Sequence, residues 1–336
     1  MKDKKKGAQT LAFRHAPVIL AASSIVGPME GKGPLGEYFD EVRDDHLWGQ
    51  KTWEKAESKL LEDAVLKVLQ KAEIPKHLVD FLFAGDLLNQ ITVSNFAAGQ
   101  LSIPFIGVYG ACSTFTESIA LGAMAIDGGY AGVVAAATSS HHDAAERQYR
   151  YPTEFGVQRL PTAQWTATAA GAALLAGAGD GPRVTYATVG KVVDFGIKDP
   201  NNMGAAMAPA AADTMRQHLH DTGRSASYYD LIVTGDLGRV GQPLARDILK
   251  GDGIDVSENF ADCGILIYSE DQDVHAGGSG CGCSAAVFGG YLMHRLEKGD
   301  LKRILLVSTG SLHSPTTYLQ GESMPAVAHA VAIERQ

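Results

Sequence analysis

Short apolar runs and longer amphipathic stretches alternate along the chain. The runs DFLFAGDL (Asp80 to Leu87) and DLIVTGDL (Asp230 to Leu237) end in polar turns and predict buried strands. Residues 53–72 place apolar side chains on one stripe, which predicts an amphipathic helix, and residues 210–219 repeat this pattern before Gly223. Strands that alternate with helices are typical of a parallel or mixed sheet covered on both faces, so we expect an α/β protein.

The chain also contains an internal repeat. The two predicted strands carry Asp, Gly, Asp and Leu at the same places. A longer similarity relates GACSTFTESIALGAMAIDGGYAGVVAAATSS from Gly110 to GCGCSAAVFGGYLMHRLEKGDLKRILLVSTGS from Gly280, each with a turn, a helix, a glycine and a strand. These repeats predict two similar halves, residues 1–180 and 181–336. Chance similarity is the alternative, because strand–helix units are common.

Charge and composition exclude several classes of protein. The 336 residues carry a formal net charge of −9, and the one strongly basic run is KDKKK at Lys2 to Lys6. Because nucleic-acid binding relies on clustered Lys and Arg, we expect no nucleic-acid partner. No run approaches the roughly 20 apolar residues that span a bilayer, and the stretch from Pro17 to Gly27 predicts a buried strand, not a signal peptide. Four cysteines without a CxxC pair indicate a reducing compartment.

Cys112 lies in the turn YGACSTF, directly before a predicted helix. Thr114 and Glu117 have the spacing of a capping box, and Gly128-Gly129 provides a stop, so the helix is expected from about Phe115 to Asp127. The positive end of a helix dipole lowers the pKa of a thiol there, as in many reactive cysteines. The alternative is that Cys112 fills a tight apolar corner, and both interpretations stay open.

Two further groups are candidate ligand-binding residues. His141 and His142 follow the predicted strand AGVVAAATSS, at the end where α/β sheets place ligands, although adjacent loop histidines are more often structural. The loop after them carries Arg147, Arg150 and Arg159 among aromatic residues. Arginines bind carboxylates bidentately and aromatic faces stack on planar ligands, while a dimer-contact arm explains the same composition.

Other chemistries have weaker support in the sequence. Cys281, Cys283, His275 and Asp262 lack the spacing of a structural zinc site. The stretch GKGPLG lacks the terminal order of a phosphate-binding loop, and no G-x-S-x-G nucleophile elbow is present. We therefore predict no protein-bound metal and no cofactor.

The internal repeat, the cysteine in YGACSTF and the strand GGYAGVVAAATSS resemble the thiolase and 3-ketoacyl-ACP synthase III superfamily. This resemblance implies two similar halves in α-β-α-β-α layers, usually a homodimer, with Cys112 as an acyl-accepting nucleophile assisted by a His and an Asn or second Cys. The corresponding turns read IVTGDLGRVG and GGSGCGCSAA, with Asp236 or Leu237 near the expected imidazole and Cys281 near the expected amide. Each lost oxyanion donor typically removes about 10²–10³ in rate, so we expect a binding pocket and no enzyme.

Within that superfamily, the stretch from Gly110 to Ala176 resembles the stage V sporulation protein AD family of endospore-forming bacteria, and the resemblance extends nearly end to end. It implies binding of dipicolinic acid, free or as its calcium chelate, during uptake into the developing spore, and a link to spore germination. It also implies membrane-protein partners from the same operon and a location in the cytoplasm or peripherally at the spore inner membrane.

From these observations we assign one set of candidate ligand-binding residues: Cys112, His141, His142, Arg147, Arg150, Asp236 and Cys281. Calcium is expected only as part of the ligand. The alternative function is a Cys112-dependent acyl-CoA or acyl-ACP transferase or condensing enzyme. A third possibility is a scaffold whose thiolase-like core is a remnant.

Overall fold

The computed structural model describes residues 4–149 and 159–335, and within them a 13-stranded sheet forms the framework. Its main path has the order β12-β11-β14-β15-β10-β3-β9-β7-β5-β6. The bounds of these strands are β3 (Val18–Val26), β5 (Phe81–Gly85), β6 (Phe105–Gly107), β7 (Val133–Ser140), β9 (Ala169–Ala176), β10 (Arg183–Val189), β11 (Leu231–Thr234), β12 (Phe260–Asp262), β14 (Arg303–Ser311) and β15 (Ala326–Glu334). The short strands are β1 (Lys5–Lys6), β2 (Thr10–Ala12) and β4 (Glu41–Val42), with β8 (Trp165–Thr166) and β13 (Gly278–Ser279) forming a separate pair.

One pattern of strand pairing occurs twice along this path. In the first half, β5 lies parallel between β6 and β7, and β9 pairs antiparallel with β7 and β3. In the second half, β11 lies parallel between β12 and β14, and β15 pairs antiparallel with β14 and β10. The repeated strand sequences therefore form β5 and β11, which occupy equivalent places. The division at residue 180 stays a prediction, because strand pairing does not test whether each half folds alone.

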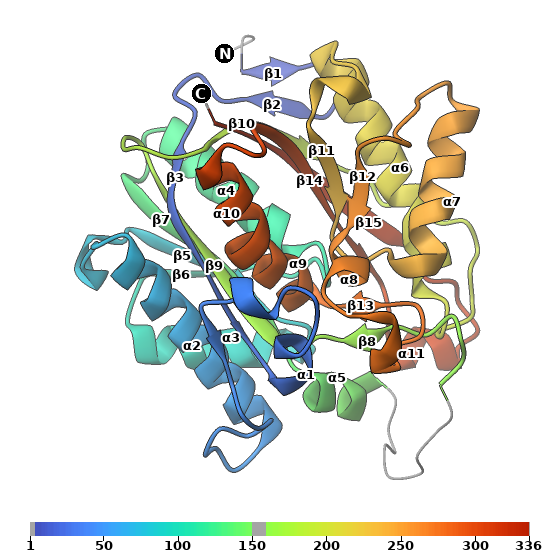
Figure 1. The fold of residues 1–336 in the computed structure, drawn as a ribbon, viewed down its shortest axis with the longest axis horizontal. Helices are drawn as coiled ribbons and strands as arrows, with labels where there is room; N and C mark the ends of the chain where they lie inside the picture. The colour runs from blue at the N-terminus through green and yellow to red at the C-terminus, as the bar shows by residue number, and fades with distance from the viewer. Residues whose placement is uncertain (1–3, 150–158, 336) are drawn as a thin grey trace.

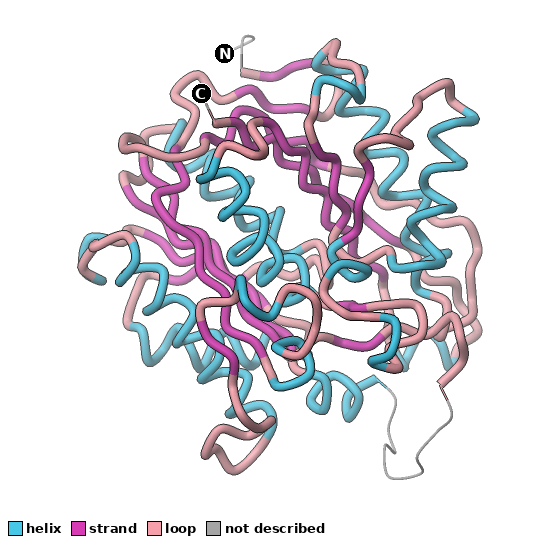
Figure 2. Tube along the Cα trace, viewed as in Figure 1, coloured by secondary structure: helices cyan, strands magenta, loops and turns pink. Residues whose placement is uncertain are grey.

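Helices lie on both outer faces of the sheet and between its two halves (Figure 1, Figure 2). The long helices α2 (Trp53–Lys71) and α3 (Thr92–Leu101) cover the first half, and α6 (Met203–Thr222) and α7 (Gly238–Gly251) cover the second. The middle layer contains α4 (Thr114–Asp127), α9 (Cys281–Val287) and α10 (Met293–Lys298). This arrangement confirms the expected α/β class with α-β-α-β-α layers.

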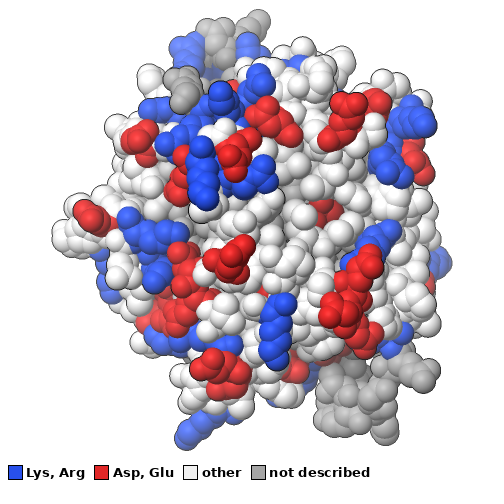
Figure 3. All heavy atoms as spheres, in the orientation of Figure 1, with Lys and Arg blue, Asp and Glu red and all other residues white. Residues whose placement is uncertain are grey.

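Shorter helical segments complete the chain. They are α1 (Pro28–Gly31), α5 (His142–Tyr149), α8 (Cys263–Leu266), α11 (Pro315–Leu319), the 3-10 turns η1 (Gly36–Tyr38), η2 (Lys76–Leu78), η3 (Asn89–Ile91), η5 (Ala226–Tyr228) and η6 (Glu270–Gln272), and the π-helical turn η7 (Phe288–Leu292) that joins α9 to α10. None of the helices within the described ranges has the length and apolar character needed to cross a membrane. On the face shown in Figure 3, basic and acidic side chains are interspersed.

Small residues let the middle helices pack directly on the sheet. A Cβ atom at Gly171 of β9 would lie 2.4 Å from the carbonyl oxygen of Ala285 in α9, so only glycine allows this approach. Larger apolar side chains fill the rest of the layer, and the rings of Phe115 and Phe288 lie 5.6 Å apart between α4 and the end of α9. The glycine- and alanine-rich composition is therefore a packing requirement of this layer.

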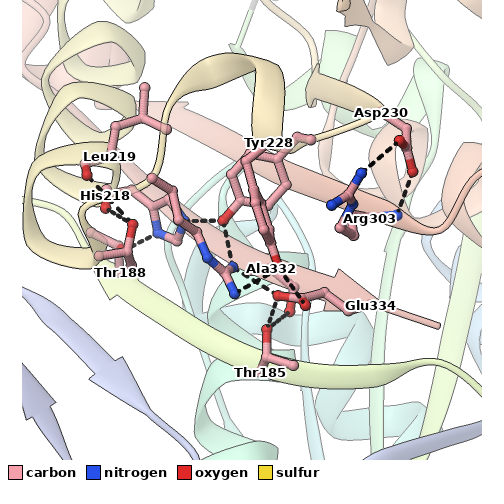
Figure 4. Close-up of polar contacts among 12 residues, drawn as sticks. Thr185, Thr188, His218, Leu219, Tyr228, Asp230, Arg303, Ala332 and Glu334 are labelled. Carbon is pink, nitrogen blue, oxygen red and sulfur yellow. Dashed lines mark hydrogen bonds and ion pairs between the residues drawn. The ribbon is translucent and has the colours of Figure 1, made fainter. Parts of the chain in front are cut away.

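A partly buried polar network attaches β15 to the second half of the sheet. Arg224 donates hydrogen bonds to the Glu334 carboxylate at 2.7 Å and to the Tyr229 hydroxyl at 2.9 Å. His218 lies beside that hydroxyl, and its Nδ1 lies 2.7 Å from the Thr188 hydroxyl (Figure 4). The network links α6, β10 and β15, so the chain end is part of the folded core.

Two histidines, the buried His218 and the partly buried His329, make stability depend on pH. Burial lowers the pKa of His218 to about 3 and that of His329 to about 4. Unfolded imidazoles titrate near pH 6.5, so below that pH the unfolded state binds more protons at these two residues, and their contribution to the free energy of unfolding falls as the pH drops. Below about pH 6 and above its folded pKa, each histidine should contribute a loss that approaches about 1.4 kcal/mol per pH unit.

Urea unfolding between about pH 7 and about pH 5 measures this dependence. His218→Gln and His329→Gln should each lower the slope of the free energy of unfolding against pH relative to the parent, whereas substitution of His220, whose side chain is 81% exposed, should leave it unchanged. Equal slopes in all four proteins would contradict the expectation.

Candidate functional site

Cys112 lies at the bottom of a small pocket at the N-terminus of α4. Its side chain is only 7% exposed, and the preceding Ala111 has a positive φ of 51° that turns the chain into the helix. The helix begins at Thr114, whose hydroxyl donates to the Ala111 carbonyl and accepts from the Gly110 N–H. The expected capping box with Glu117 is therefore wrong, because Thr114 is already helical and its hydroxyl closes the preceding turn.

A carboxyl group takes part in the same site. Asp236 follows β11 and is fully buried, and its Oδ2 accepts hydrogen bonds from the Ser279 hydroxyl at 3.2 Å and the Gly280 N–H at 2.9 Å. Its Oδ1 has no hydrogen-bond partner within residues 4–149 and 159–335. The Ser279 hydroxyl lies 3.9 Å from the Cys112 sulfur, so thiol, hydroxyl and carboxyl form one cluster.

Burial controls the protonation of this cluster. It raises the pKa of the Cys112 thiol well above its usual range, and the nearby Asp236 carboxylate raises that pKa further. Burial also raises the pKa of Asp236 to about 7. The expected lowering of the thiol pKa by the helix dipole is therefore wrong, because loss of solvation and a neighbouring negative charge outweigh the dipole. A protonated thiol is a weak nucleophile.

Cys281 lies beneath the same pocket at the start of α9. Its sulfur donates to the Ser139 carbonyl oxygen at 3.0 Å, and burial raises the pKa of its thiol. It belongs to a small apolar cluster with Cys112, Leu87 and Ala145. The structure thus brings Cys112, Asp236 and Cys281 together, as the thiolase-like resemblance implied for Cys281 and for Asp236 or Leu237.

The pocket above Cys112 is nearly closed and has aromatic walls. Its free volume is about 30 Å³. The hydroxyls of Tyr109 and Tyr149 lie 3.4 Å apart, and the ring of Tyr149 stacks on that of His313 with centroids 5.3 Å apart. The remaining lining residues are Leu87, Ala111, Ala145, Glu146, Thr166, Met203, Ser279 and Ser311.

Sequence reasoning missed His313, although the internal repeat contains a signal for it. The first strand of the repeat continues as TSSHH to His142, and the second continues as TGSLH to His313. Strand pairing shifts this alignment by one residue: Phe81 pairs with Val134 and Leu231 with Ile304, so His313 occupies the place of Asp143, the residue after His142.

His141 and His142 lie at a second hollow. It measures about 740 Å³ and is lined by Asp45, His46, Leu47, Gly49, Gln50, Trp53, His142, Asp143 and Trp165, none of which lines the Cys112 pocket. The His142 ring stacks on Trp165 with centroids 3.5 Å apart. His141 is buried, which lowers its pKa, and its Nε2 lies 2.8 Å from the carbonyl oxygen of His46.

Arg147 is directed away from the Cys112 pocket, toward α2. Arg147 forms an ion pair with Glu54 on α2, and its guanidinium lies 5.3 Å from the centre of the Trp53 ring. Arg150 lies outside the described residues. The six described candidates are thus divided between two places, and a role of each of the seven in ligand binding stays a prediction.

Solved structures of low sequence identity share this fold. The 3-oxoacyl-[acyl-carrier-protein] synthase III from Aquifex aeolicus VF5 has a TM-score of 0.57 at 12% identity, with 95% of this chain and 99% of that chain covered. A variant of OleA from Xanthomonas campestris has a TM-score of 0.60 at 17% identity, with 96% and 99% covered. The tetronic acid condensing enzyme AbyA1 has a TM-score of 0.59 at 16% identity, with 95% and 99% covered. These similarities establish a thiolase-like fold.

Sequence comparison gives a much closer relationship. Stage V sporulation protein AD of Bacillus subtilis (strain 168) is 50% identical over 332 residues, which are 99% of this chain and 98% of the relative. The family described as stage V sporulation protein AD matches residues 7–334. The chain therefore belongs to the stage V sporulation protein AD family.

Proposed function

We propose that this chain is a non-enzymatic binding protein of sporulation that holds dipicolinate, pyridine-2,6-dicarboxylate, in the Cys112 pocket. The observation that carries the proposal is the group that accompanies the thiol. Where the thiolase-like resemblance implies an imidazole, this chain has the buried carboxyl of Asp236, with a pKa of about 7. A carboxyl there suits hydrogen bonding to a ligand better than activation of a thiol that burial keeps protonated.

The chemistry of the pocket fits a flat ligand with two carboxylates. The stacked rings of Tyr149 and His313 offer a planar wall. The hydroxyls of Ser279 and Ser311 are hydrogen-bond donors for carboxylate oxygens. A carboxyl with a pKa near 7 is partly neutral at that pH, and its neutral form donates a hydrogen bond, which makes the unpartnered Oδ1 of Asp236 a third contact.

The pocket must open to accept such a ligand. Its volume of about 30 Å³ is far below the roughly 300 Å³ at the lower end of ordinary ligand pockets. Tyr149, at the end of α5, closes it by donating a hydrogen bond to the Leu87 carbonyl oxygen. In our proposal the ligand displaces this contact, and the end of α5 moves outward.

Membership in the stage V sporulation protein AD family supports a role in spore formation. The biological part of the proposal is that the chain delivers dipicolinate, free or as its calcium chelate, to membrane proteins that carry it into the developing spore. Calcium takes part as a component of the ligand. A location in the cytoplasm or at the spore inner membrane, and a later role in germination, belong to the same proposal.

Calorimetric titration with dipicolinate, with and without calcium, tests where the ligand binds. We expect saturable binding that His313→Ala weakens by about tenfold, since an aromatic contact contributes roughly 0.5–1.5 kcal/mol beyond its buried area. His142→Ala is the matched control, because His142 also stacks on an aromatic ring but lies at the second hollow. Loss of affinity in His142→Ala alone would place the ligand there and contradict the proposed pocket.

A second experiment separates binding from catalysis. We expect no mass increase of the intact protein after incubation with acetyl-CoA, because the raised pKa of Cys112 keeps its thiol protonated near neutral pH. Cys112→Ser should bind dipicolinate within about twofold of the parent, since the two side chains differ little in size. An acetyl adduct that Cys112→Ala abolishes would establish the acyl-transfer alternative.

We further propose that two copies of the chain associate through β6. This strand ends the main path of the sheet, so one side of its backbone has no neighbouring strand in that path. Apolar side chains lie beside it: Ile106 is 44% exposed and Phe96, on the adjacent α3, is 68% exposed. An exposed apolar edge strand is a template for pairing with another chain, and a second copy offers the same edge.

Light scattering coupled to size-exclusion chromatography measures the association. A dimer is expected for the parent protein and a monomer for the double variant Phe96→Lys with Ile106→Lys, because charges at a sheet edge oppose pairing. Leu319→Lys is the control, since Leu319 is 80% exposed but belongs to α11. A dimer that survives the double variant would place the interface elsewhere.

A further inference from the structure

Two imidazoles and a carboxylate converge at the second hollow. His46 lies in the loop after β4, while His141 and Asp143 lie at the junction of β7 and α5. The ligating atoms of the three residues all lie within 4.8 Å of one another. The Oδ2 atom of Asp143 is 3.6 Å from Nδ1 of His46 and 3.9 Å from Nδ1 of His141. Both distances are too long for hydrogen bonds, so the three groups face a common point without bonding to one another.

The hydrogen bond of His141 determines which ring nitrogen faces that point. Its Nε2 lies 2.8 Å from the carbonyl oxygen of His46, and because a carbonyl only accepts, Nε2 carries the proton. In the neutral ring, Nδ1 then presents a lone pair toward Asp143. His141 is fully buried, and this Nδ1 atom has no hydrogen-bond partner in the described part of the chain. A buried lone pair that faces a carboxylate is unfavourable unless a cation lies between them.

The Nδ1 atom of His46 is in the same situation. It is buried, and within the described ranges it has no hydrogen-bond partner. Two nitrogen ligands and one oxygen ligand are thus already directed at one place. The contact between Nε2 of His141 and a backbone carbonyl is the outer contact that typically orients a metal-binding histidine.

We propose that His46, His141 and Asp143 bind one divalent transition-metal ion, for which zinc is the best match. Zinc binds imidazole nitrogen and carboxylate oxygen at about 2.0–2.2 Å, and tetrahedral geometry then separates neighbouring ligand atoms by roughly 3.4 Å. The two distances to Asp143, 3.6 and 3.9 Å, are longer by about half an ångström or less, and all three ligating atoms lie within 4.8 Å of one another, so side-chain rotations that draw them together complete the geometry. Calcium prefers ligand sets made of oxygen, and two imidazoles select against it.

Three protein ligands leave a fourth coordination position, as in zinc sites that bind water or a small ligand. His46 and Asp143 both line the hollow of about 740 Å³, so the fourth position opens toward it. The site is therefore suited to a small anionic molecule that completes the coordination. It shares no residue with the Cys112 pocket and does not depend on dipicolinate binding there.

Metal titration of the full-length protein, prepared without a histidine tag and treated with EDTA, tests the site. Cobalt(II) serves as the visible probe: we expect one equivalent to produce a d–d absorption spectrum and zinc to displace it. Zinc should also raise the melting temperature, since an ion that binds only the native state stabilises it. Calcium should neither produce nor displace the signal.

Two variants and one matched control assign the signal to these residues. His46→Ala and Asp143→Asn should weaken cobalt and zinc binding by at least about tenfold, because even the loss of a residue that only supports a metal ligand typically costs this much affinity. His220→Ala is the matched control, because the Nδ1 atom of His220 also lies 3.6 Å from an aspartate oxygen, that of Asp221. The His220 side chain is 81% exposed and lies outside the proposed site, so this variant should bind metal as the parent does. Far-ultraviolet circular dichroism without metal checks that each variant is folded. If His46→Ala does not fold, His46→Gln is measured in its place.

Three results would overturn the proposal. The first is the absence of a stoichiometric cobalt spectrum and of zinc-dependent stabilisation in the parent protein. The second is equal metal affinity in the parent, His46→Ala and Asp143→Asn. The third is a near-ultraviolet thiolate-to-cobalt band that Cys112→Ala removes, which would assign the metal to the cysteine pocket.

Discussion

The close packing of α9 on β7 and β9 is the constraint on which the Cys112 pocket depends. A Cβ atom at Gly282 would lie 2.1 Å from the carbonyl oxygen of Ala169, so the first turn of α9 rests directly on the sheet. The hydroxyl of Thr138 holds this turn by donating to the Cys281 carbonyl at 3.0 Å. Ser279 and Gly280 immediately precede this helix. They therefore lie where they can donate hydrogen bonds to Asp236, which follows β11 in the half of the sheet opposite β7 and β9.

The same closeness determines the chemistry of the pocket. Because α4 and α9 share one layer, the residues before their first turns meet in a region from which water is excluded. Removal of solvent raises the pKa of both Cys112 and Asp236, and the carboxylate opposes ionisation of the thiol. An imidazole in place of Asp236 would instead form an ion pair with a thiolate. The exchange of one side chain thus changes the favoured protonation state of the cysteine without any change of fold.

The parts of the structure that follow from local patterns could be predicted from the sequence, and those that follow from long-range contacts could not. The repeated strand sequences predicted β5 and β11 in equivalent places. The proximity of Asp236 or Leu237, and of Cys281, to Cys112 was implied only by the resemblance to the thiolase superfamily and not by any local pattern. The direction of the thiol pKa shift was wrong, because burial and the carboxylate of Asp236 arise only in the folded chain. The sequence suggested no metal site, because the only candidate cluster that its spacing offered contained cysteines. The cluster proposed here joins His141 to His46, a residue 95 positions earlier in the chain, and only the fold brings these two together.

The geometry of α5 explains why the predicted binding residues are divided between two places. Residues four apart share one face of a helix, and residues two apart lie on nearly opposite faces. Asp143 and Arg147 therefore face the His46 loop and α2, whereas Ala145 and Tyr149 face the Cys112 pocket. An ion bound by Asp143 would hold the first turn of the helix to the loop after β4, while the last turn carries the tyrosine that closes the pocket. Since these contacts lie at opposite ends of α5, the pocket can open by movement of the last turn while the first turn stays attached, which makes the two sites compatible on one short helix.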